Sequence, residues 1–353
     1  MAILLVATAF IAAGAISFPG SGKGTGEAVP NFGGESLVVV NYGGTFSSVW
    51  QKYVIAPFEA KYNAKIIQET GLTFDTLAKM RAQKDNPQID VWMMADSGAV
   101  IAKRENLIQP LDPNAIPNLK LLIPKARKVG DPYADFLFTS TVIAYNKNFV
   151  KTPPKSWLDL WKPEYKGKVI LPDINTCCGN LFLMQMSKLN GGNIDYNIQP
   201  GFKKIESLKH SVLAFWNSQD QAANLLVSGQ AWIGVWSADR AGTQAFQGAP
   251  IGLAFPKEGV TLLGNSIGIT KGTKHLKLAQ AYVNFALDAA QQRQVDENAI
   301  LQPTNSKVRL SPRVAQYAPS ASVLKKSFTP NWTRVAINMP AWTAQWERDV
   351  TSP

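Results

Sequence analysis

The sequence predicts an α/β protein of two domains, in which parallel strands alternate with helices. With 353 residues, the chain is longer than one hydrophobic core usually supports. Short apolar runs alternate with amphipathic segments from residue 37 onward, which is the pattern of doubly wound parallel sheets. A proline-rich connector, "VKTPPKSWLDLWKPEYKGKVILPD", separates two such regions and places a boundary near residues 147–167.

The chain opens with an apolar stretch from Ala2 to about Phe18, followed by a polar, glycine-rich segment. The stretch is short for a membrane span and is typical of a signal peptide, although no Lys or Arg precedes it. The alternative is an uncleaved N-terminal anchor. We expect residues 1–30 to be a cleaved signal peptide, without a cysteine for lipid attachment, and the protein to be exported to the periplasm.

The first region begins with a strand, a glycine turn and a helix. Leu37–Val40 are consecutive apolar residues, as in a strand buried on both faces. Gly43 and Gly44 permit a tight turn into a helix that carries Trp50, Val54 and Phe58. Further along the chain, we expect a strand at 64–70, a helix at 74–83, a strand–turn–helix unit at 89–106 and a strand at 138–149.

The second region repeats the alternation beyond the connector. We expect strands at 168–172 and 231–241, and helices at 180–188, 202–209 and 220–228, with the segment 211–218 between the second and third helices. Segments 251–259 and 262–272 close this region. Leu278, Tyr282 and Phe285 then mark an amphipathic helix, since their spacing places them on one face.

The net charge is +11, which is compatible with an anionic membrane surface or an acidic partner. However, the Lys and Arg residues are scattered, and the sequence contains no basic block or RNA-binding motif. We therefore expect no nucleic-acid partner.

Four loops follow predicted strands and lead into predicted helices. In open parallel sheets, ligands bind at such loops, beyond the carboxyl ends of the strands. Their backbone N–H groups and hydroxyls suit an anionic or hydrogen-bond-accepting group, although each loop alone is also compatible with simple capping. The loops are residues 42–45, 96–98, 175–179 and 236–239.

The order of several motifs resembles extracellular solute-binding proteins of ABC importers, in the branch of the spermidine/putrescine-binding and ferric-ion-binding proteins. The motifs are "SWLDLWKPEYKGKVILPD", "SGQAWIGVWSADRA", "FPKEG", "GNSIGITKGTKH" and "LQPTNSKV". The resemblance implies a type II periplasmic-binding fold, in which two α/β lobes are joined by two crossing strands and hold the ligand between them. It implies crossings near Thr141–Asn146 and Asn265–Thr270.

On this basis, we expect lobe one to comprise residues 37–143 plus 268–310, and lobe two residues 147–264 plus 311–353. The resemblance also implies that Trp236 packs against the ligand, through apolar contact and cation–π attraction, although burial in the core is the alternative. Phe138 is a weaker candidate for the same role. The residues expected to bind the ligand are Tyr42, Gly44, Thr45, Ser97, Thr139, Thr176, Cys178, Trp236, Asp239 and Asn265.

The chain departs from the polyamine-binding pattern in one motif. It has Leu263 and Asn265 where those proteins carry a Trp and an Asp, and a buried dication without carboxylates is poorly compensated. Asp239 can supply one carboxylate and Asp173 or Asp96 another, but the positive charge of Arg240 partly neutralises that of Asp239. We therefore expect a small amine-bearing or zwitterionic solute, delivered to the membrane permease of an ABC importer by a monomeric protein.

Two alternatives remain. A ferric-ion or anion-binding protein of the same fold is disfavoured for iron, because the sequence has no Tyr-Tyr pair and only His210 and His275. An enzyme on this fold would use Cys177 or Cys178 as a nucleophile, but a cysteine hydrolase needs a histidine partner. We expect no catalysis, cofactor or metal. A disulfide between Cys177 and Cys178 would be strained, because adjacent Cα atoms are about 3.8 Å apart and disulfides usually span roughly 4.4–6.8 Å. Two reduced thiols are the simpler expectation.

Overall fold

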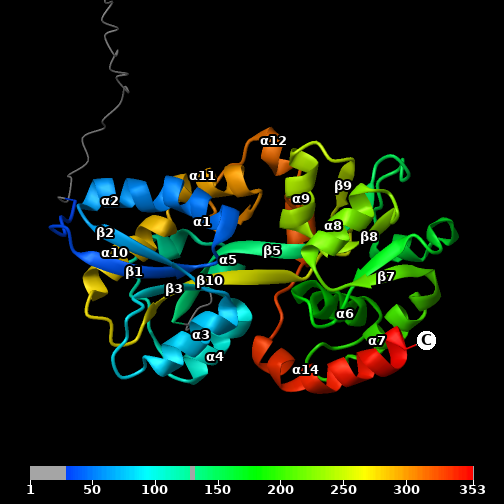
Figure 1. Ribbon diagram of the computed structural model, residues 1–353, viewed down its shortest axis with the longest axis horizontal. Helices are drawn as coiled ribbons and strands as arrows, with labels where there is room; N and C mark the ends of the chain where they lie inside the picture. Colours follow the sequence, from blue (N-terminus) through cyan, green and yellow to red (C-terminus); the bar gives the residue numbers. More distant parts are fainter. Residues whose placement is uncertain (1–28, 128–131, 353) are drawn as a thin grey trace, which may run out of the picture.

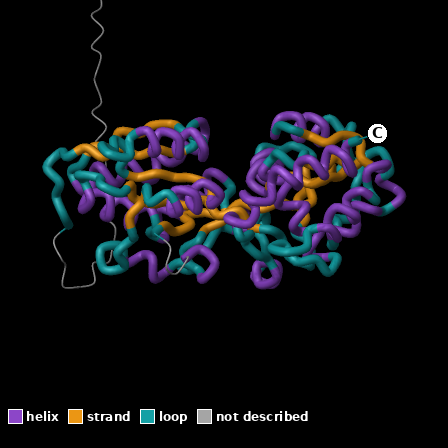
Figure 2. The backbone as a smooth tube through the Cα atoms, turned by 90° about the horizontal axis from the view of Figure 1, so that it is seen from below, coloured by secondary structure: helices purple, strands orange, loops and turns teal. Residues whose placement is uncertain are grey.

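The computed structural model describes residues 29–127 and 132–352. It has two lobes joined by a narrow waist of strands (Figures 1 and 2), which confirms the predicted two-lobed α/β fold. The expected signal peptide, residues 1–30, falls almost entirely outside the described residues. No helix in the described part of the chain is long and apolar enough to cross a membrane.

The strands form one sheet that passes through both lobes, in the order β2-β1-β3-β10-β5-β8-β6-β7. Within each lobe the central strands are parallel: β1 pairs with β2 and β3, and β6 pairs with β7 and β8. β5 and β10 run antiparallel to their neighbours. The strands are β1 (Ser36–Asn41), β2 (Lys65–Thr70), β3 (Val91–Ala95), β4 (Ile108–Gln109), β5 (Tyr133–Asn146), β6 (Val169–Pro172), β7 (Val212–Trp216), β8 (Ile233–Ser237), β9 (Ile251–Ala254), β10 (Leu262–Thr270) and β11 (Gln302–Pro303).

β5 carries the sheet from one lobe into the other. Its first half pairs with β10 as far as Ser140, and from Thr141 onward it pairs with β8. β10 pairs with β3, β4 and the first half of β5. Asn265–Thr270, expected as the second crossing, therefore lie within the first lobe, and the chain crosses before Leu262. Residues 259–270 are buried throughout, so no change of pattern in the sequence marks the crossing.

The helices of the first lobe cover both faces of its part of the sheet (Figure 1). The predicted helix around Trp50, Val54 and Phe58 is one continuous helical segment, and all three side chains are buried. The indole Nε1 of Trp50 donates to the hydroxyl of Tyr282, 2.8 Å away, on the predicted amphipathic helix α10. The helical elements are α1 (Gly44–Trp50), η1 (Gln51–Ile55), α2 (Ala56–Tyr62), α3 (Thr73–Ala82), α4 (Asp96–Arg104), η2 (Pro117–Leu121), α5 (Pro124–Arg127), α10 (Leu276–Ala286) and α11 (Ala289–Ala299).

The helices of the second lobe surround β6, β7 and β8. The helix expected from residue 180 begins three residues earlier, because the side chain of Thr176 caps it by accepting from the N–H of Gly179 at 3.0 Å. The proline-rich connector forms two short 3₁₀ helices. The elements are η3 (Trp157–Trp161), η4 (Pro163–Tyr165), α6 (Cys177–Leu189), α7 (Gln199–Glu206), η5 (Lys209–Ser211), α8 (Gln219–Val227) and α9 (Ala238–Phe246).

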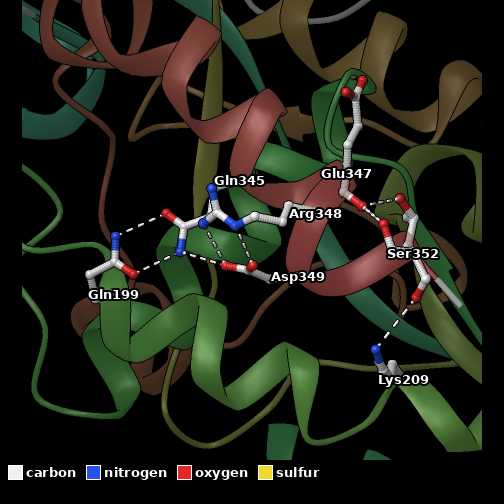
Figure 3. Close-up of polar contacts among 8 residues, drawn as sticks. Gln199, Lys209, Gln345, Glu347, Arg348, Asp349 and Ser352 are labelled. Atoms are coloured by element: carbon white, nitrogen blue, oxygen red, sulfur yellow. Dashed lines mark hydrogen bonds and ion pairs between the residues drawn. The ribbon is translucent and has the colours of Figure 1, made fainter.

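The C-terminal helix α14 (Trp332–Trp346) connects the two lobes along one side of the molecule. It contacts α4 of the first lobe, and its continuation η6 (Glu347–Thr351) contacts α7 of the second (Figure 1). Figure 3 shows its polar attachment, in which the amides of Gln345 and Gln199 donate to each other at 2.7 and 2.9 Å, and Lys209 donates to the carbonyl oxygen of Ser352 at 3.4 Å. Two short helices, α12 (Pro312–Ala315) and α13 (Ala321–Lys326), precede it.

Candidate functional site

The four predicted loops each connect a strand to a helix. They join β1 to α1, β3 to α4, β6 to α6, and β8 to α9. The first two belong to one lobe and the last two to the other. Because a parallel strand directs its carboxyl end toward the start of the following helix, these loops place backbone N–H groups and polar side chains near the crossing strand β5.

Tyr42 and Asn265 form the centre of a polar cluster in the first lobe. Tyr42 follows β1, Asn265 lies on β10, and the tyrosine hydroxyl donates to the Oδ1 of Asn265 at 2.8 Å. Burial raises the pKa of Tyr42 well above its ordinary value, and the negative charges of Asp96 and Asp135 raise it further. The tyrosine is therefore protonated at neutral pH and lies in a negative electrostatic potential.

Two carboxyl groups lie beneath this pair. Asp96 begins α4, Asp135 lies on β5, and both are completely buried. The hydroxyl of Ser266 lies 2.6 Å from one Asp96 oxygen and 2.9 Å from one Asp135 oxygen. A Cβ at Gly264 would come within 2.6 Å of both carboxyl groups, so only glycine leaves room for them at this point of β10.

Asp239 is the central residue of a second cluster, in the other lobe. It lies in the first turn of α9, and one of its oxygens accepts a hydrogen bond from the Thr139 hydroxyl at 2.8 Å. Arg240 approaches the other oxygen at 3.8 Å, but its side chain is 63% exposed, so this ion pair is weak. The Asp239 carboxylate also raises the pKa values of Cys177 and Cys178, although it is not the largest influence on either thiol.

A pocket of about 320 Å³ lies where β6 and β7 end and where α6 and α8 begin. The hydroxyl of Thr176 serves the helix start, since it accepts from Gly179 and donates to the carbonyl oxygen of Asp173 at 2.7 Å. Ser218 caps α8 in the same way. Two helix N-termini therefore meet at one pocket, an arrangement that favours a negatively charged group. Its lining residues are Asp173, Asn175, Thr176, Cys177, Trp216, Asn217, Ser218 and Gln219.

Trp236 is a core residue in this structure. Its side chain is 1% exposed and packs with Val142, Cys178 and Trp216. Its indole N–H donates to the Oε1 of Gln219 at 2.6 Å. The indole therefore presents no open face, and the cation–π contact inferred from the family resemblance has no exposed surface on which to form in this conformation. Phe138 is also 2% exposed.

The two clusters are neighbours across the crossing strands. Thr139, which donates a hydrogen bond to Asp239, pairs with Leu263 on β10. Asn265 is two residues further along β10. With a rise of about 3.3 Å per residue, the pairing position of Thr139 lies roughly 7 Å along β10 from Asn265. The structure thus brings Tyr42, Asn265, Thr139 and Asp239 to the junction of the two lobes.

The remaining residues predicted to bind the ligand lie outside the hydrogen bonds described above. Gly44 is exposed at the start of α1 with a φ of 58°, and the side chain of Thr45 lies outside the described part of the structure. Ser97 is half-buried in the first turn of α4, beside Asp96. Cys178 is 1% exposed, whereas its neighbour Cys177, which the prediction did not include as a ligand contact, lines the pocket.

Three polar residues were not predicted from the sequence: Asp135 and Ser266 in the first cluster, and Gln219 at the pocket of the second lobe. Asp135 had a detectable signal, since it is the single charged residue of the predominantly apolar strand β5. A charge inside such a strand is costly unless it is compensated, so it often marks a functional position. Ser266 and Gln219 had no such signal, because small polar residues and helix-capping residues are common everywhere.

The chain is similar to known bacterial solute-binding proteins. The family model for bacterial extracellular solute-binding proteins matches residues 53–320. The spermidine/putrescine-binding periplasmic protein of Escherichia coli (strain K12) is 30% identical over 298 residues, covering 78% of this chain and 83% of that protein. A putative 2-aminoethylphosphonate-binding periplasmic protein of Salmonella paratyphi A is 23% identical over 287 residues, covering 79% and 80%.

A solved structure agrees with these relatives. The crystal structure of an ABC transporter from Clostridium perfringens superimposes with a TM-score of 0.79 at 26% identity, covering 89% of this chain and 100% of that one. These similarities confirm the fold and the solute-binding role that the sequence motifs predict. The chain belongs to the bacterial extracellular solute-binding protein family.

Proposed function

We propose that this protein captures a small amine-bearing or zwitterionic solute at the junction of its two lobes, and delivers it to the membrane permease of an ABC importer. The observation that carries the proposal is the concentration of carboxyl groups at the junction, where Asp135 lies on β5 itself, Asp96 begins α4 and Asp239 lies in the first turn of α9. They occur there in a protein with a net charge of +11. A cationic group is therefore favoured at the junction although the molecule as a whole repels it.

The ammonium end of the solute is assigned to the first lobe. Tyr42 and Asn265 offer hydroxyl and amide oxygens there. The pKa of Tyr42 is raised chiefly by burial and further by the negative charges of Asp96 and Asp135. Two relatives support this assignment, because their names specify spermidine, putrescine and 2-aminoethylphosphonate, all of which carry an amine.

The acidic end of a zwitterion, if the solute has one, is assigned to the second lobe. The pocket between the starts of α6 and α8 provides helix N-termini for it, and its volume of about 320 Å³ is at the lower limit for a small-molecule site. Binding at both lobes would draw them together, and the closed form is the one we expect to dock on the permease. No covalent chemistry is needed, so we propose a binding protein and not an enzyme, exported to the periplasm and acting as a monomer.

A thermal-shift screen of the mature protein tests this proposal. The panel contains putrescine, spermidine, 4-aminobutyrate, 2-aminoethylphosphonate, inorganic phosphate and ferric citrate. We expect an amine-bearing compound to raise the melting temperature in a saturable manner, since a ligand that binds the native state stabilises it by mass action. Stabilisation by phosphate or ferric citrate, with no effect of any amine, would reject the amine assignment and favour the anion or iron alternative.

A further inference from the structure

The two cysteines form a vicinal dithiol at the first turn of α6. They are the only cysteines of the chain, both are free, and their sulfur atoms lie 3.8 Å apart. Cys177 is exposed, whereas Cys178 is 1% exposed and lies behind it in the core of the second lobe. The solute-binding function proposed above needs neither sulfur.

The surroundings leave one of the two thiols open to small molecules. Cys177 lines the pocket between α6 and α8, together with the amide and hydroxyl groups of Asn217 and Ser218. Cys178 is within hydrogen-bonding reach of Gln219, which also lines the pocket. A molecule that enters the pocket therefore meets the Cys177 sulfur first, and the second sulfur is close behind it.

We propose that Cys177 and Cys178 form a two-sulfur chelating site for a thiophilic centre that carries its own third substituent, of which a monosubstituted trivalent arsenical is the chemical class. Soft centres prefer sulfur ligands. Trivalent arsenic is pyramidal, so bonds of about 2.3 Å to each sulfur with an angle of roughly 100° between them place the two sulfurs about 3.5 Å apart. The two thiols lie 3.8 Å apart, so chelation requires only a small movement of the helix start.

The chemistry is a condensation without any change of oxidation state. Two arsenic–sulfur bonds form, and two arsenic–oxygen bonds of an R–As(OH)₂ group break. Each hydroxide leaves with one thiol proton as water. Cys177 reacts first, because the hydrogen bond from the Cys178 thiol lowers its pKa and the N–H groups of the helix start contribute in the same direction. Cys178, whose pKa is raised, closes the ring after its partner has bound.

A consequence follows for solute binding, and this part rests on the proposed function. An arsenical held by the two sulfurs occupies the pocket at the start of α6, where the acidic end of a zwitterionic solute is assigned. The loaded protein should therefore bind such a solute more weakly. Chelation itself is measured without any solute, so its outcome is independent of whether the solute assignment is correct.

Intact-mass spectrometry with phenylarsine oxide tests the site. The full mature chain is reduced, freed of reductant and compared with Cys177→Ser, Cys178→Ser and the double variant, which has no cysteine. We expect one arsenical per wild-type chain, retained against excess 2-mercaptoethanol and released by dithiothreitol. Each single variant should bind roughly 100-fold more weakly, because it loses the benefit of a second attachment point.

The melting temperatures of the variants serve as the control for folding, since serine is close to cysteine in size. Equal retention of the arsenical by either single variant would overturn the chelate. So would the absence of a one-to-one adduct on the reduced wild-type protein. If chelation is confirmed while the thermal-shift screen finds no amine-bearing solute, the dithiol site stands and the solute assignment fails.

Discussion

In the second lobe, burial decides which of the predicted side chains can contact a ligand. Trp236 and Cys178 belong to one core cluster, although the family resemblance predicts a ligand contact for Trp236 and the strand-to-helix loop predicts one for Cys178. Burial gives the tryptophan a structural role and leaves Cys177, one residue from the predicted contact, at the pocket. The sequence indicated a loop that does line a pocket, but a difference of one position decides which sulfur is accessible.

Replacing Trp236 by alanine should mainly destabilise the protein. The side chain is almost completely buried, and its loss leaves a cavity and removes the shorter of two hydrogen bonds to the Oε1 of Gln219. We expect a loss of about 3–5 kcal/mol in the free energy of unfolding, measured by chemical denaturation. Trp232→Ala is the matched control, because Trp232 is half-buried, and it should cost less. A Trp236→Ala protein of unchanged stability that fails to bind solute would restore the ligand-contact role.

The two thiols should differ in their reaction with iodoacetamide as the pH changes. The pKa of Cys177 is lowered and that of Cys178 is raised, in each case chiefly through the hydrogen bond between them. Since the thiolate is the reactive form, alkylation of Cys177 should set in at a lower pH than that of an unperturbed cysteine peptide. Residue-resolved mass spectrometry over a pH series measures this. Alkylation of Cys178 before Cys177 would refute the assignment.

At the scale of secondary-structure elements, the sequence predicted the strands and helices that have a strong hydrophobic pattern. The strand–loop–helix units that position Tyr42, Asp96, Thr176 and Asp239 were recognisable, because buried parallel strands and amphipathic helices have distinct patterns. The start of α6 at Cys177 was missed by three residues, since hydrophobic periodicity begins only after the cap. The crossing before Leu262 could not be predicted from the sequence, because a strand that is buried along its whole length shows no alternation of polar and apolar residues.

Helix α14 is the element whose removal should affect the whole molecule. Trp346 at its end is fully buried and contacts the ring of Phe215 edge to face, with centroids 5.8 Å apart. Trp346→Ala should lower the free energy of unfolding by about 3–5 kcal/mol. Gln345→Ala removes the amide pair with Gln199 and the hydrogen bond to Asp349 at 3.1 Å (Figure 3), and should cost only about 1 kcal/mol. Equal losses in chemical denaturation would show that α14 is held by its polar contacts instead.

At the scale of the whole molecule, the two lobes share one sheet. β5 passes from the first lobe to the second between Ser140 and Thr141, and Thr139, two residues before Thr141, donates a hydrogen bond to Asp239. The residues that join the lobes are therefore next to those proposed to bind the solute. We therefore expect solute binding at this junction to be coupled to the relative position of the lobes.

The most direct measurement is calorimetric titration of the first amine-bearing hit from the screen into the wild-type protein, Tyr42→Phe and Tyr53→Phe. Both tyrosines donate to an asparagine Oδ1, but Tyr53 pairs with Asn298 on the exposed surface of the first lobe. We predict one site per chain and roughly tenfold weaker binding by Tyr42→Phe, the loss of one hydrogen bond near a charge, with Tyr53→Phe unchanged. Equal affinities for all three proteins would contradict binding at the lobe junction.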